Sequence, residues 1–459
     1  MTLSRRGFLA QLGATAAVSA ATSVPAKAVS ISFNDLRGGY DASQSGLRPG
    51  AVDDQSKIFQ QVLNSAAAED KPVFLPPGLY QVSNIVIPSR TRLMGVPGAS
   101  KLVYSGGGHF LMAENADFLE FTGLVIDGVN RPINEYAAAG LRVINAKHVA
   151  IDNCEVVGCR EIGIEIDRSS GRIERSKISG ASGNAGIFAL ENKGLIINNN
   201  RVEDCANAGI MVYRWQRGED NTIVTGNRVA RIAAAKGGTG PWGNGINTYQ
   251  ADNVMVTNNH VSDCAFSTIR SNSCDNIQIT GNTCLRAGET SVYSEFAFNG
   301  AMVSNNIIDG GARGISIVNL DHGGRLAVCS NNLIRNIKDT APYKDENHLF
   351  GDGISAEADI SITGNVIERT ARFGMKLGWG HYLRNLVASN NVIRNTGTGF
   401  YVTVVEGTGN ASITGNLLSD IRESGITGYR WREAVTGDMA KSGAGSYSNL
   451  TIENNTLSY

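Results

Sequence analysis

Short alternations of apolar and polar residues recur along most of the chain. One unit contains Val254-Met255-Val256 and the next contains Ile277-Gln278-Ile279, each followed by a turn with Asn and then two more extended residues. A Gly-Ile pair later in many units begins another alternating segment, as at Gly245-Ile246. Alternation over three to five residues, broken by Gly and Asn, is typical of strands joined by tight turns. Each unit therefore predicts several short strands.

The units share an anchor, a Gly-Asn or Asn-Asn pair followed by one residue and an aliphatic. Counting two weaker copies at the start, the second residues of these pairs are Cys154, Ser176, Asn200, Asn227, Asn259, Asn282, Asn306, Asn332, Asn365, Asn391, Asn416 and Asn455. Their spacings run from 22 residues (Cys154 to Ser176) to 39 (Asn416 to Asn455). A repeat this short is one coil of a solenoid. The Asn side chains, stacked once per coil, could hydrogen-bond to one another in a ladder.

The fold expected from this repeat is all-β, a right-handed parallel β-helix of three strands per coil and roughly 12 or more coils. A β-propeller or a leucine-rich repeat fits less well, because the spacing is too short for a blade and no Leu-x-x-Leu consensus occurs. Residues 111–459 hold the repeats, and residues 29–110 are expected to form an N-terminal cap with the first coils.

Composition narrows the possible partners. The 459 residues carry a net charge of −1, so no basic excess points to nucleic acid. No run of eighteen apolar residues follows the N-terminus, so the sequence predicts no membrane span. Cys159, Cys205 and Cys264 each lie three residues after an aliphatic of the repeat, which predicts buried core positions rather than a disulfide framework. Neither a Cys-x-x-Cys nor a His-x-x-x-His spacing occurs, so the sequence predicts no zinc site.

The first 28 residues have the order of an export signal. Ser4-Arg5-Arg6-Gly7-Phe8-Leu9 precedes an Ala-rich apolar stretch that ends in Ala26-Lys27-Ala28. This resembles a twin-arginine signal peptide with a small-residue cleavage pattern. We therefore expect export by the twin-arginine machinery, a mature protein that begins at about residue 29, and a periplasmic or secreted location.

Residues 53–80 differ from the repeats. Asp53-Asp54-Gln55-Ser56 begins a predicted helix with Ile58, Phe59, Val62 and Leu63 on one face, and Leu75-Pro76-Pro77-Gly78 with Tyr80 predicts a strand, a turn and a strand. This segment, with Gln60 completing its Asp-Asp-x-Ser-x-x-x-Gln pattern, resembles the entry segment of pectate-lyase-like right-handed β-helix proteins. Together with the signal and the Asn-rich coils, the whole chain resembles a twin-arginine-translocated repeat protein family of unassigned activity.

The resemblance implies fold and export more than chemistry. The paired-Asp signature of polygalacturonases is missing, because Asn247-Thr248 is followed by Tyr249. The Asp-Pro-His motif of alginate epimerases and the Arg-x-Pro-x-x-Arg pattern of pectate lyases are missing too. No specific activity is carried over from those families.

One sheet is predicted to hold the site. The strand beginning Gly-Ile sends Ile inward and two neighbours outward. Two long insertions, 232–244 and 337–352, lie before such strands, and a third, about 430–447, follows one. Solenoids concentrate insertions on their binding face. All four Trp lie there, and flat aromatic rings beside polar groups suit a sugar chain. The candidate substrate-binding residues are Asn247, Tyr249, Asn272, Tyr213, Trp215, Trp242, Lys376, Trp379 and Asp352.

Between the first two insertions the candidate catalytic residues are Glu295, Glu357, Arg270 and Tyr293. Glu295 and Glu357 occupy equivalent rows two coils apart, about 9.6 Å at the backbone, with Val318 between them. Side chains could bring the carboxyls into the roughly 6.5–9.5 Å window of an inverting glycosidase. Elimination from a uronate is the other possibility, with Arg270 or Lys376 neutralising the acid and Tyr293 or Tyr249 moving protons. No protein cofactor is expected, although a lyase could use Ca²⁺.

Two functions follow from the sequence. The first is an exported enzyme that cleaves or modifies a polysaccharide by hydrolysis or elimination between insertions 232–244 and 337–352. The alternative is a non-catalytic envelope protein that binds glycan or cell-wall material along the same face. The terminal coil shows no obvious cap, and an exposed last strand could support trimeric or end-to-end association.

Overall fold

The computed structural model describes residues 38–238, 240–343 and 349–458. The predicted signal peptide, residues 1–28, lies outside the described residues. Within the described ranges no helix is long and apolar enough to cross a membrane.

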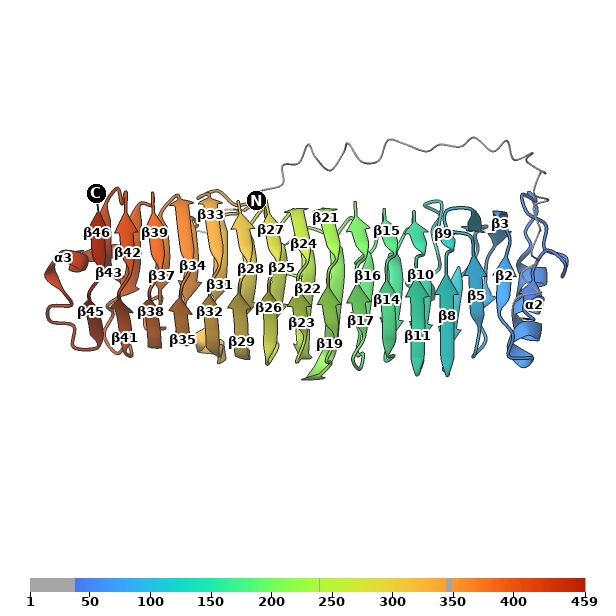
Figure 1. The fold of residues 1–459 in the computed structure, drawn as a ribbon, viewed down its shortest axis with the longest axis horizontal. Coiled ribbons are helices and arrows are strands. Elements are labelled where there is room, and N and C mark those ends of the chain that lie inside the picture. The colour runs from blue at the N-terminus through green and yellow to red at the C-terminus, as the bar shows by residue number, and fades with distance from the viewer. Residues whose placement is uncertain (1–37, 239, 344–348, 459) are drawn as a thin grey trace, which may run out of the picture. The chain divides into compact units, whose positions relative to one another are not determined.

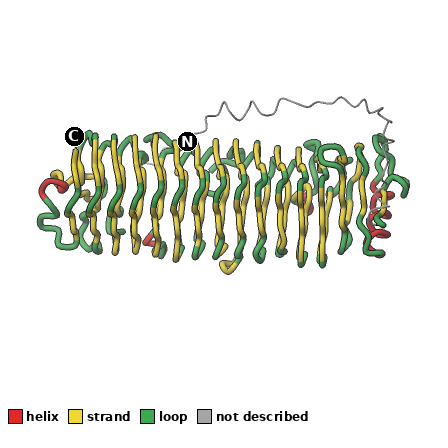
Figure 2. The backbone as a smooth tube through the Cα atoms, viewed as in Figure 1, coloured by secondary structure: helices red, strands yellow, loops and turns green. Residues whose placement is uncertain are grey.

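The described strands form three long sheets, here called sheets A, B and C. Each coil contributes one strand to A, then one to B, then one to C, and equivalent strands of successive coils pair in parallel. Figures 1 and 2 show the described coils stacked side by side in chain order. This is a right-handed parallel β-helix, which confirms the predicted fold.

The bounds of the strands are given sheet by sheet. Sheet A contains β1 (Tyr40–Asp41), β2 (Val73–Leu75), β5 (Arg92–Gly95), β8 (Phe118–Thr122), β11 (His148–Asp152), β14 (Gly171–Glu174), β17 (Ile196–Asn198), β20 (Ile223–Thr225), β23 (Met255–Thr257), β26 (Ile277–Thr280), β29 (Asn299–Ser304), β32 (Arg325–Ser330), β35 (Ala358–Thr363), β38 (Arg384–Ser389), β41 (Ala411–Thr414) and β45 (Leu450–Glu453). Sheet B contains β3 (Gly78–Val82), β6 (Ser100–Tyr104), β9 (Val125–Asp127), β12 (Glu155–Val157), β15 (Lys177–Ser179), β18 (Arg201–Glu203), β21 (Arg228–Ile232), β24 (His260–Cys264), β27 (Thr283–Leu285), β30 (Ile307–Asp309), β33 (Leu333–Ile337), β36 (Val366–Thr370), β39 (Val392–Arg394), β42 (Leu417–Ser419) and β46 (Thr456–Ser458). Sheet C contains β4 (Ile85–Val86), β7 (Leu111–Glu114), β10 (Ala139–Ile144), β13 (Ile162–Asp167), β16 (Ile187–Leu190), β19 (Ala208–Glu219), β22 (Asn244–Asp252), β25 (Ile269–Asn272), β28 (Thr290–Glu295), β31 (Arg313–Ile317), β34 (Asp352–Ala356), β37 (Phe373–Leu377), β40 (Thr398–Thr403), β43 (Ser424–Arg430) and β44 (Glu433–Asp438).

An Asn ladder joins the coils at the turn between sheets A and B. From Asn200 to Asn455 each ladder Asn donates from Nδ2 to Oδ1 of the next, at 2.9 to 3.1 Å. Ser176 and Cys154 hold the equivalent positions before it, where the Ser176 hydroxyl accepts from the Cys154 N–H. The predicted ladder is thus confirmed. The Cys prediction is confirmed too: all seven cysteines are free thiols and buried in the described residues.

A helix covers the N-terminal coils. Helix α2 (Ser56–Ala68) buries Phe59, Val62, Leu63 and Ala66 against the core, which confirms the helix predicted from the apolar face at residues 58–63. Two 3-10 turns, η1 (Glu135–Ala137) and η2 (Leu320–His322), lie in loops of the described residues.

At the C-terminal end sheet C carries an added return strand and a helical turn, so for this sheet the expectation that the last coil lacks a cap is corrected, whereas β45 and β46 are the last strands of sheets A and B. The insertion at 430–447 folds back, so that β44 pairs antiparallel with β43 and is followed by α3 (Met439–Ser442). Met439 enters the main core and is buried. The return strand pairs with β43 and becomes the last strand of sheet C, so the edge that remains is a short antiparallel strand rather than one that continues the parallel stack.

Candidate functional site

Sheet C presents its outward side chains in straight rows, because its strands pair without slipping at these positions. One row in register contains Met211, Asn247, Arg270, Tyr293, Ser316, Ser355, Lys376 and Tyr401. A second row contains Tyr213, Tyr249, Asn272 and Glu295. These are the rows predicted from the Gly-Ile repeat.

The insertions border the same sheet. Loop 233–243 joins β21 to β22, and the stretch 338–351 joins β33 to β34, so each enters sheet C directly. Three pockets lie on this face and are named here by their order along the coils. The N-terminal pocket has about 250 Å³, the central pocket about 170 Å³ and the C-terminal pocket about 300 Å³.

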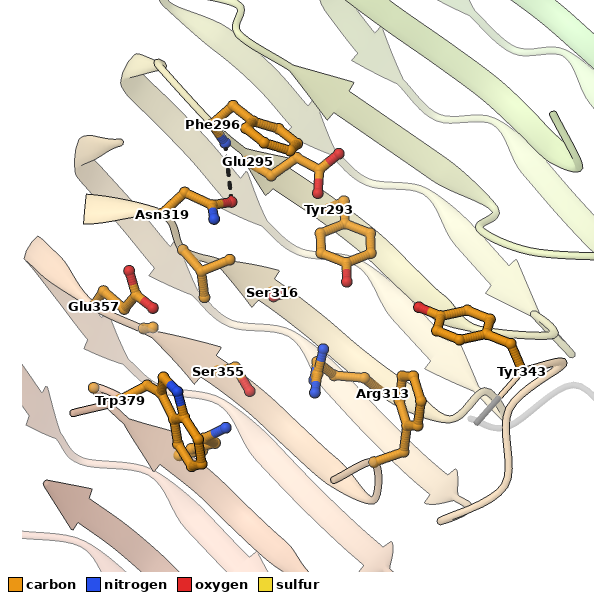
Figure 3. A pocket seen from close by; sticks show the side chains of 15 residues that line it. Tyr293, Glu295, Phe296, Arg313, Ser316, Asn319, Tyr343, Ser355, Glu357 and Trp379 are labelled. Carbon is orange, nitrogen blue, oxygen red and sulfur yellow. Dashed lines mark hydrogen bonds between the residues drawn. The ribbon is translucent and has the colours of Figure 1, made fainter. Parts of the chain in front are cut away.

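The central pocket gathers most of the predicted catalytic groups. Glu295, Glu357, Tyr293, Lys376 and Trp379 all line it. Figure 3 shows the Glu295 carboxyl next to Tyr293 and Glu357 apart from both, near Trp379, with Arg313 and Tyr343 on the side away from Glu357. Strand pairing sets Ser294 beside Ile317 and Ile317 beside Ala356. Glu295, Val318 and Glu357 are the next residues along these three adjacent coils. The backbone separation of the two Glu is therefore about two strand spacings, or ~9.6 Å.

Glu295 is held by a cation. Arg270 donates from Nε to Glu295 Oε1 at 2.6 Å and also forms an ion pair with it through a second nitrogen. The Asn272 amide donates to the same oxygen at 3.4 Å, and Arg270 bonds the carbonyl oxygen of Gly240. Burial raises the pKa of Glu295, while the Arg270 guanidinium opposes that rise. The Arg270 guanidinium thus binds both Glu295 and the first insertion.

Glu357 sits in a different environment. Only 8% of the residue is exposed, and its Oε2 accepts a hydrogen bond from the backbone N–H of Leu320 at 2.8 Å. Burial raises the pKa of Glu357 to about 7, and backbone N–H groups and the Lys376 charge oppose the rise. A carboxyl with such a pKa holds a proton near neutrality, which is what a general acid needs.

Behind Tyr293 lies a buried acid that the sequence prediction missed. Glu289 is 4% exposed and accepts hydrogen bonds from Tyr343 at 2.7 Å and from Tyr293 at 3.5 Å. Burial raises the pKa of Glu289 and raises that of Tyr293 to about 12. Tyr293 therefore stays protonated at neutral pH and is a hydrogen-bond donor rather than a base.

The prediction for Asp352 needs correction. Asp352 is fully buried, and Arg313 donates to it from Nε at 3.3 Å, so its carboxylate fixes Arg313 and is closed to a ligand. Arg313 lines the central pocket and also stacks on Phe350, at 5.2 Å from the ring centre. Sequence reasoning missed it because the position before the Gly of each Gly-Ile pair was not counted as outward. The equivalent spacing of Arg313-Gly314-Ile315 and Asp352-Gly353-Ile354 was the available signal.

The N-terminal pocket holds the other predicted binding residues. Tyr213, Trp215, Asn247, Tyr249, Asn272 and Arg270 line it together with Gly240 and Pro241. Asn247 donates to the Tyr213 hydroxyl at 2.7 Å, and Trp215 is 62% exposed. Trp242 does not line this pocket but packs, as Tyr249 does, against an outer apolar cluster, and the Lys236 amine lies 5.0 Å from the Trp242 ring centre. The aromatic rings predicted from the sequence therefore gather on one face.

Lys376 and Trp379 separate the central pocket from the C-terminal one and line both. The Lys376 amine lies 4.2 Å from the Trp379 ring centre, a cation–π contact. Among the described residues no cluster of three or more His, Cys, Asp or Glu is arranged to hold a metal ion. Assays with and without Ca²⁺ test whether the protein needs this ion.

Comparison with known proteins supports the fold. A family model described as "Right handed beta helix region" matches residues 110–240 and 215–326. No curated protein matches the sequence. The pre-mature gene product 12 of bacteriophage phi29 is similar in structure at 17% identity and a TM-score of 0.55, over 92% of this chain and 59% of that one. The chain thus spans less than two thirds of that structure. PfbA, a surface adhesin of Streptococcus pneumoniae, is similar at 15% identity and a TM-score of 0.51, over 92% of this chain and 99% of that one.

Proposed function

We propose that this protein is an exported enzyme that hydrolyses a polysaccharide bound along sheet C, with Glu357 as the proton donor. The observation that carries the proposal is the environment of Glu357 in the central pocket. Its carboxyl is buried, its pKa is raised to about 7, and it stands beside an aromatic ring and a lysine. Donating a proton to a leaving oxygen needs a carboxyl that is still protonated at the working pH.

Glu295 is the second carboxyl of the proposed reaction. Two strand spacings, about 9.6 Å, separate the backbones of these residues, which is close to the roughly 6.5–9.5 Å separation at which a water fits between an acid and a base. The Arg270 guanidinium stabilises the carboxylate form of Glu295, the form that activates a water. Glu357 donates its proton to the glycosidic oxygen, water attacks the anomeric carbon, and Glu295 takes the proton of that water.

Hydrolysis accounts for these contacts better than elimination. An elimination needs a base at the sugar and a free cation for its acid group. Burial raises the pKa of Tyr293 to about 12, so at neutral pH almost none of this side chain is in the deprotonated form that could act as the base. Arg270 already neutralises Glu295 and is therefore not a free cation. Elimination remains a measurable outcome, because it creates a double bond that absorbs near 235 nm whereas hydrolysis does not.

The test is a screen of acidic and neutral polysaccharides for new reducing ends and for absorbance at 235 nm, with and without Ca²⁺. Glu357→Gln and Glu295→Gln are measured beside Glu453→Gln, an exposed control on sheet A. We expect reducing ends without 235-nm absorbance, lost in the first two variants and kept in the control. Cleavage that survives Glu357→Gln overturns the assignment, and growth at 235 nm replaces hydrolysis with elimination.

Non-catalytic glycan binding is the second candidate, and one observation favours it. Exposed or half-buried aromatic side chains lie along the whole face, from Trp215 in the N-terminal pocket to Trp431 in the C-terminal one, rather than only beside the two Glu. The fold is also that of a pneumococcal surface adhesin. A glycan that changes the tryptophan fluorescence but is never cleaved would support this alternative.

Export through the twin-arginine pathway belongs to the same proposal and rests on Arg5 and Arg6 followed by an apolar stretch. We expect Arg5→Lys with Arg6→Lys to leave the precursor inside the cell, because the pathway's receptor reads the arginine pair. Fractionation followed by immunoblotting measures this. Unchanged export of the double variant would refute the assignment.

A further inference from the structure

The C-terminal pocket is built from stacked aromatic rings. Tyr401 and Tyr429 stack at 4.4 Å between ring centres and 17° between planes, and Trp379 lies nearly parallel to Tyr401 at 6.4 Å. Phe373 packs against both tyrosines edge-on. These rings occupy outward positions of β37, β40 and β43 or the turn after β37, so the sheet itself fixes their spacing. Tyr401 is buried within this stack, so the rings that can offer a face to a sugar are those of Tyr429, Trp379 and Trp431.

Trp431 closes this pocket in an unusual backbone conformation. Its φ is 56°, in the left-handed region that a bulky side chain rarely adopts. The Tyr401 hydroxyl donates to the Trp431 carbonyl at 2.7 Å, and the indole lies so close to Gly380 that a β-carbon there would clash with the ring. The contacts hold a 43% exposed indole in place beside the pocket. Trp431 and Arg432 are the two turn residues between β43 and β44, where a tight hairpin favours a positive φ, so the hairpin itself holds the indole beside the pocket.

The charges of this pocket are unbalanced. Arg372, Lys376 and Arg432 line it with a single carboxylate, Glu423, whose Oε2 accepts a hydrogen bond from Thr398 at 3.1 Å. Among the described residues neither Arg372 nor Arg432 forms an ion pair, and the Arg372 guanidinium lies 5.8 Å from the centre of the Phe373 ring. By contrast, Arg270 and Arg313 along the same groove are each bonded to a carboxylate.

We propose that the C-terminal pocket is a subsite for a sugar residue that carries an anionic group, a carboxylate or a sulfate ester. Trp431 and Tyr429 take the ring, and Arg372 and Arg432 take the anion through charge-assisted, bidentate hydrogen bonds. The inference rests on the proposed function, because it makes the polysaccharide that crosses the central pocket an acidic one. The volume of about 300 Å³ is at the lower end of the range for small-molecule sites.

The test compares probes that differ only in charge. Hexagalacturonate is measured against its methyl ester, and a sulfated galactan hexasaccharide against its desulfated form, by calorimetry and tryptophan fluorescence. The variants are Arg372→Gln and Arg432→Gln, with Arg394→Gln on sheet B as a matched surface control. Thermal melting of each variant checks that the fold is kept.

We expect at least one anionic probe to bind about tenfold or more tightly than its neutral form. Each pocket variant should lose roughly tenfold in affinity for that probe and little for the neutral one, while Arg394→Gln keeps both. Preference for hexagalacturonate identifies a carboxylate, and preference for the sulfated probe identifies a sulfate ester. Equal binding of charged and neutral forms, no binding of any probe, or unchanged affinity in both pocket variants would overturn the inference.

These outcomes separate the two proposals. Cleavage of a neutral polysaccharide without a preference for anions would leave the proposed hydrolase in place and refute the anionic subsite. Selective anion binding that both arginine variants lose, in a protein that cleaves nothing, would establish the subsite and refute the hydrolase.

Discussion

Glu357 and Glu295 show how two similar side chains on one face acquire different chemistry. Burial disfavours the charged form of each. For Glu295 a guanidinium at 2.6 Å opposes that effect, whereas for Glu357 the main opposing contacts are backbone N–H groups. Environments that separate the protonation of two carboxyls are the usual basis of an acid–base pair.

The first prediction concerns activity and pH. Because Glu357 must be protonated to act, kcat/KM should fall as pH rises through about 7, the raised pKa of this carboxyl. Glu357→Gln should lower kcat by roughly 10²–10⁴-fold, and Glu453→Gln should leave it unchanged. A steady-state pH profile of wild type and both variants provides the measurement. A wild-type rate that stays flat from pH 6 to 9 would exclude Glu357 as the acid.

A second prediction concerns stability. A carboxyl whose pKa is raised on folding contributes stability that is fully present below its unfolded pKa, about 4.3, and is lost as pH rises through about 7. The free energy of unfolding of wild type relative to Glu357→Gln should therefore fall between pH 5 and pH 8, by about 2–3 kcal/mol. Urea unfolding at both pH values measures it. A difference between the two proteins that does not change with pH would contradict the raised pKa.

At the scale of elements, the Asn ladder is the clearest link from sequence to stability. Asn332 donates to Asn365 at 2.9 Å and to the Val303 carbonyl at 3.0 Å, while its own Oδ1 accepts from Asn306. Truncation leaves several buried groups without partners, so Asn332→Ala should cost about 2–3 kcal/mol of unfolding free energy.

The control for the ladder lies at its end. Asn455 is half-buried, and in the described residues it accepts from Asn416 but has no following Asn. Asn455→Ala should therefore shift the urea midpoint less than Asn332→Ala, and the exposed Ser361→Ala should barely shift it. Equal shifts for Asn332→Ala and Ser361→Ala would mean that the ladder carries little of the stability.

The repeated elements could be predicted because the same sequence pattern recurs in each coil. The Gly-Ile pairs gave the inward and outward rows of sheet C, and the Asn anchors gave the turns. The side-chain contacts of the site were not predictable in the same way. Glu289 meets Tyr343 across 54 positions through an irregular loop, and Arg313 meets Asp352 across 39. Which oxygen accepts from which donor depends on loop geometry that no period in the sequence describes.

The candidate site shows the same division. The sequence placed Glu295, Glu357, Tyr293, Lys376 and Trp379 on one face, and the structure brings these five into one pocket. It missed that Asp352 is closed to solvent and that Arg270 is already paired, because burial of an outward side chain depends on the insertions that fold over it. The third insertion likewise turned out to close the end of sheet C as well as line a pocket.

At the scale of the β-helix, the C-terminal cap should govern stability and association. Met439 of α3 is buried in the main core, whereas Val435 of β44 is 37% exposed. Met439→Asp places a charge in the core and should cost about 3 kcal/mol or more, detach the cap and promote self-association through the uncovered edge of sheet C. Val435→Asp, in the same hairpin, should do neither. Thermal melting and sedimentation velocity measure both effects, and matching behaviour of the two variants would refute this role of the cap.

The pockets on sheet C define one groove, and the central claim is that a polysaccharide lies across it with its scissile bond at Glu357. A crystal structure of Glu357→Gln with a hexasaccharide of the polysaccharide that the wild-type protein cleaves tests this most directly. The account predicts sugar rings against Trp379, a glycosidic oxygen within hydrogen-bond distance of residue 357, and an anionic substituent at Arg372 and Arg432. A hexasaccharide bound to sheet A or B, or one that crosses sheet C without approaching residue 357, would contradict it.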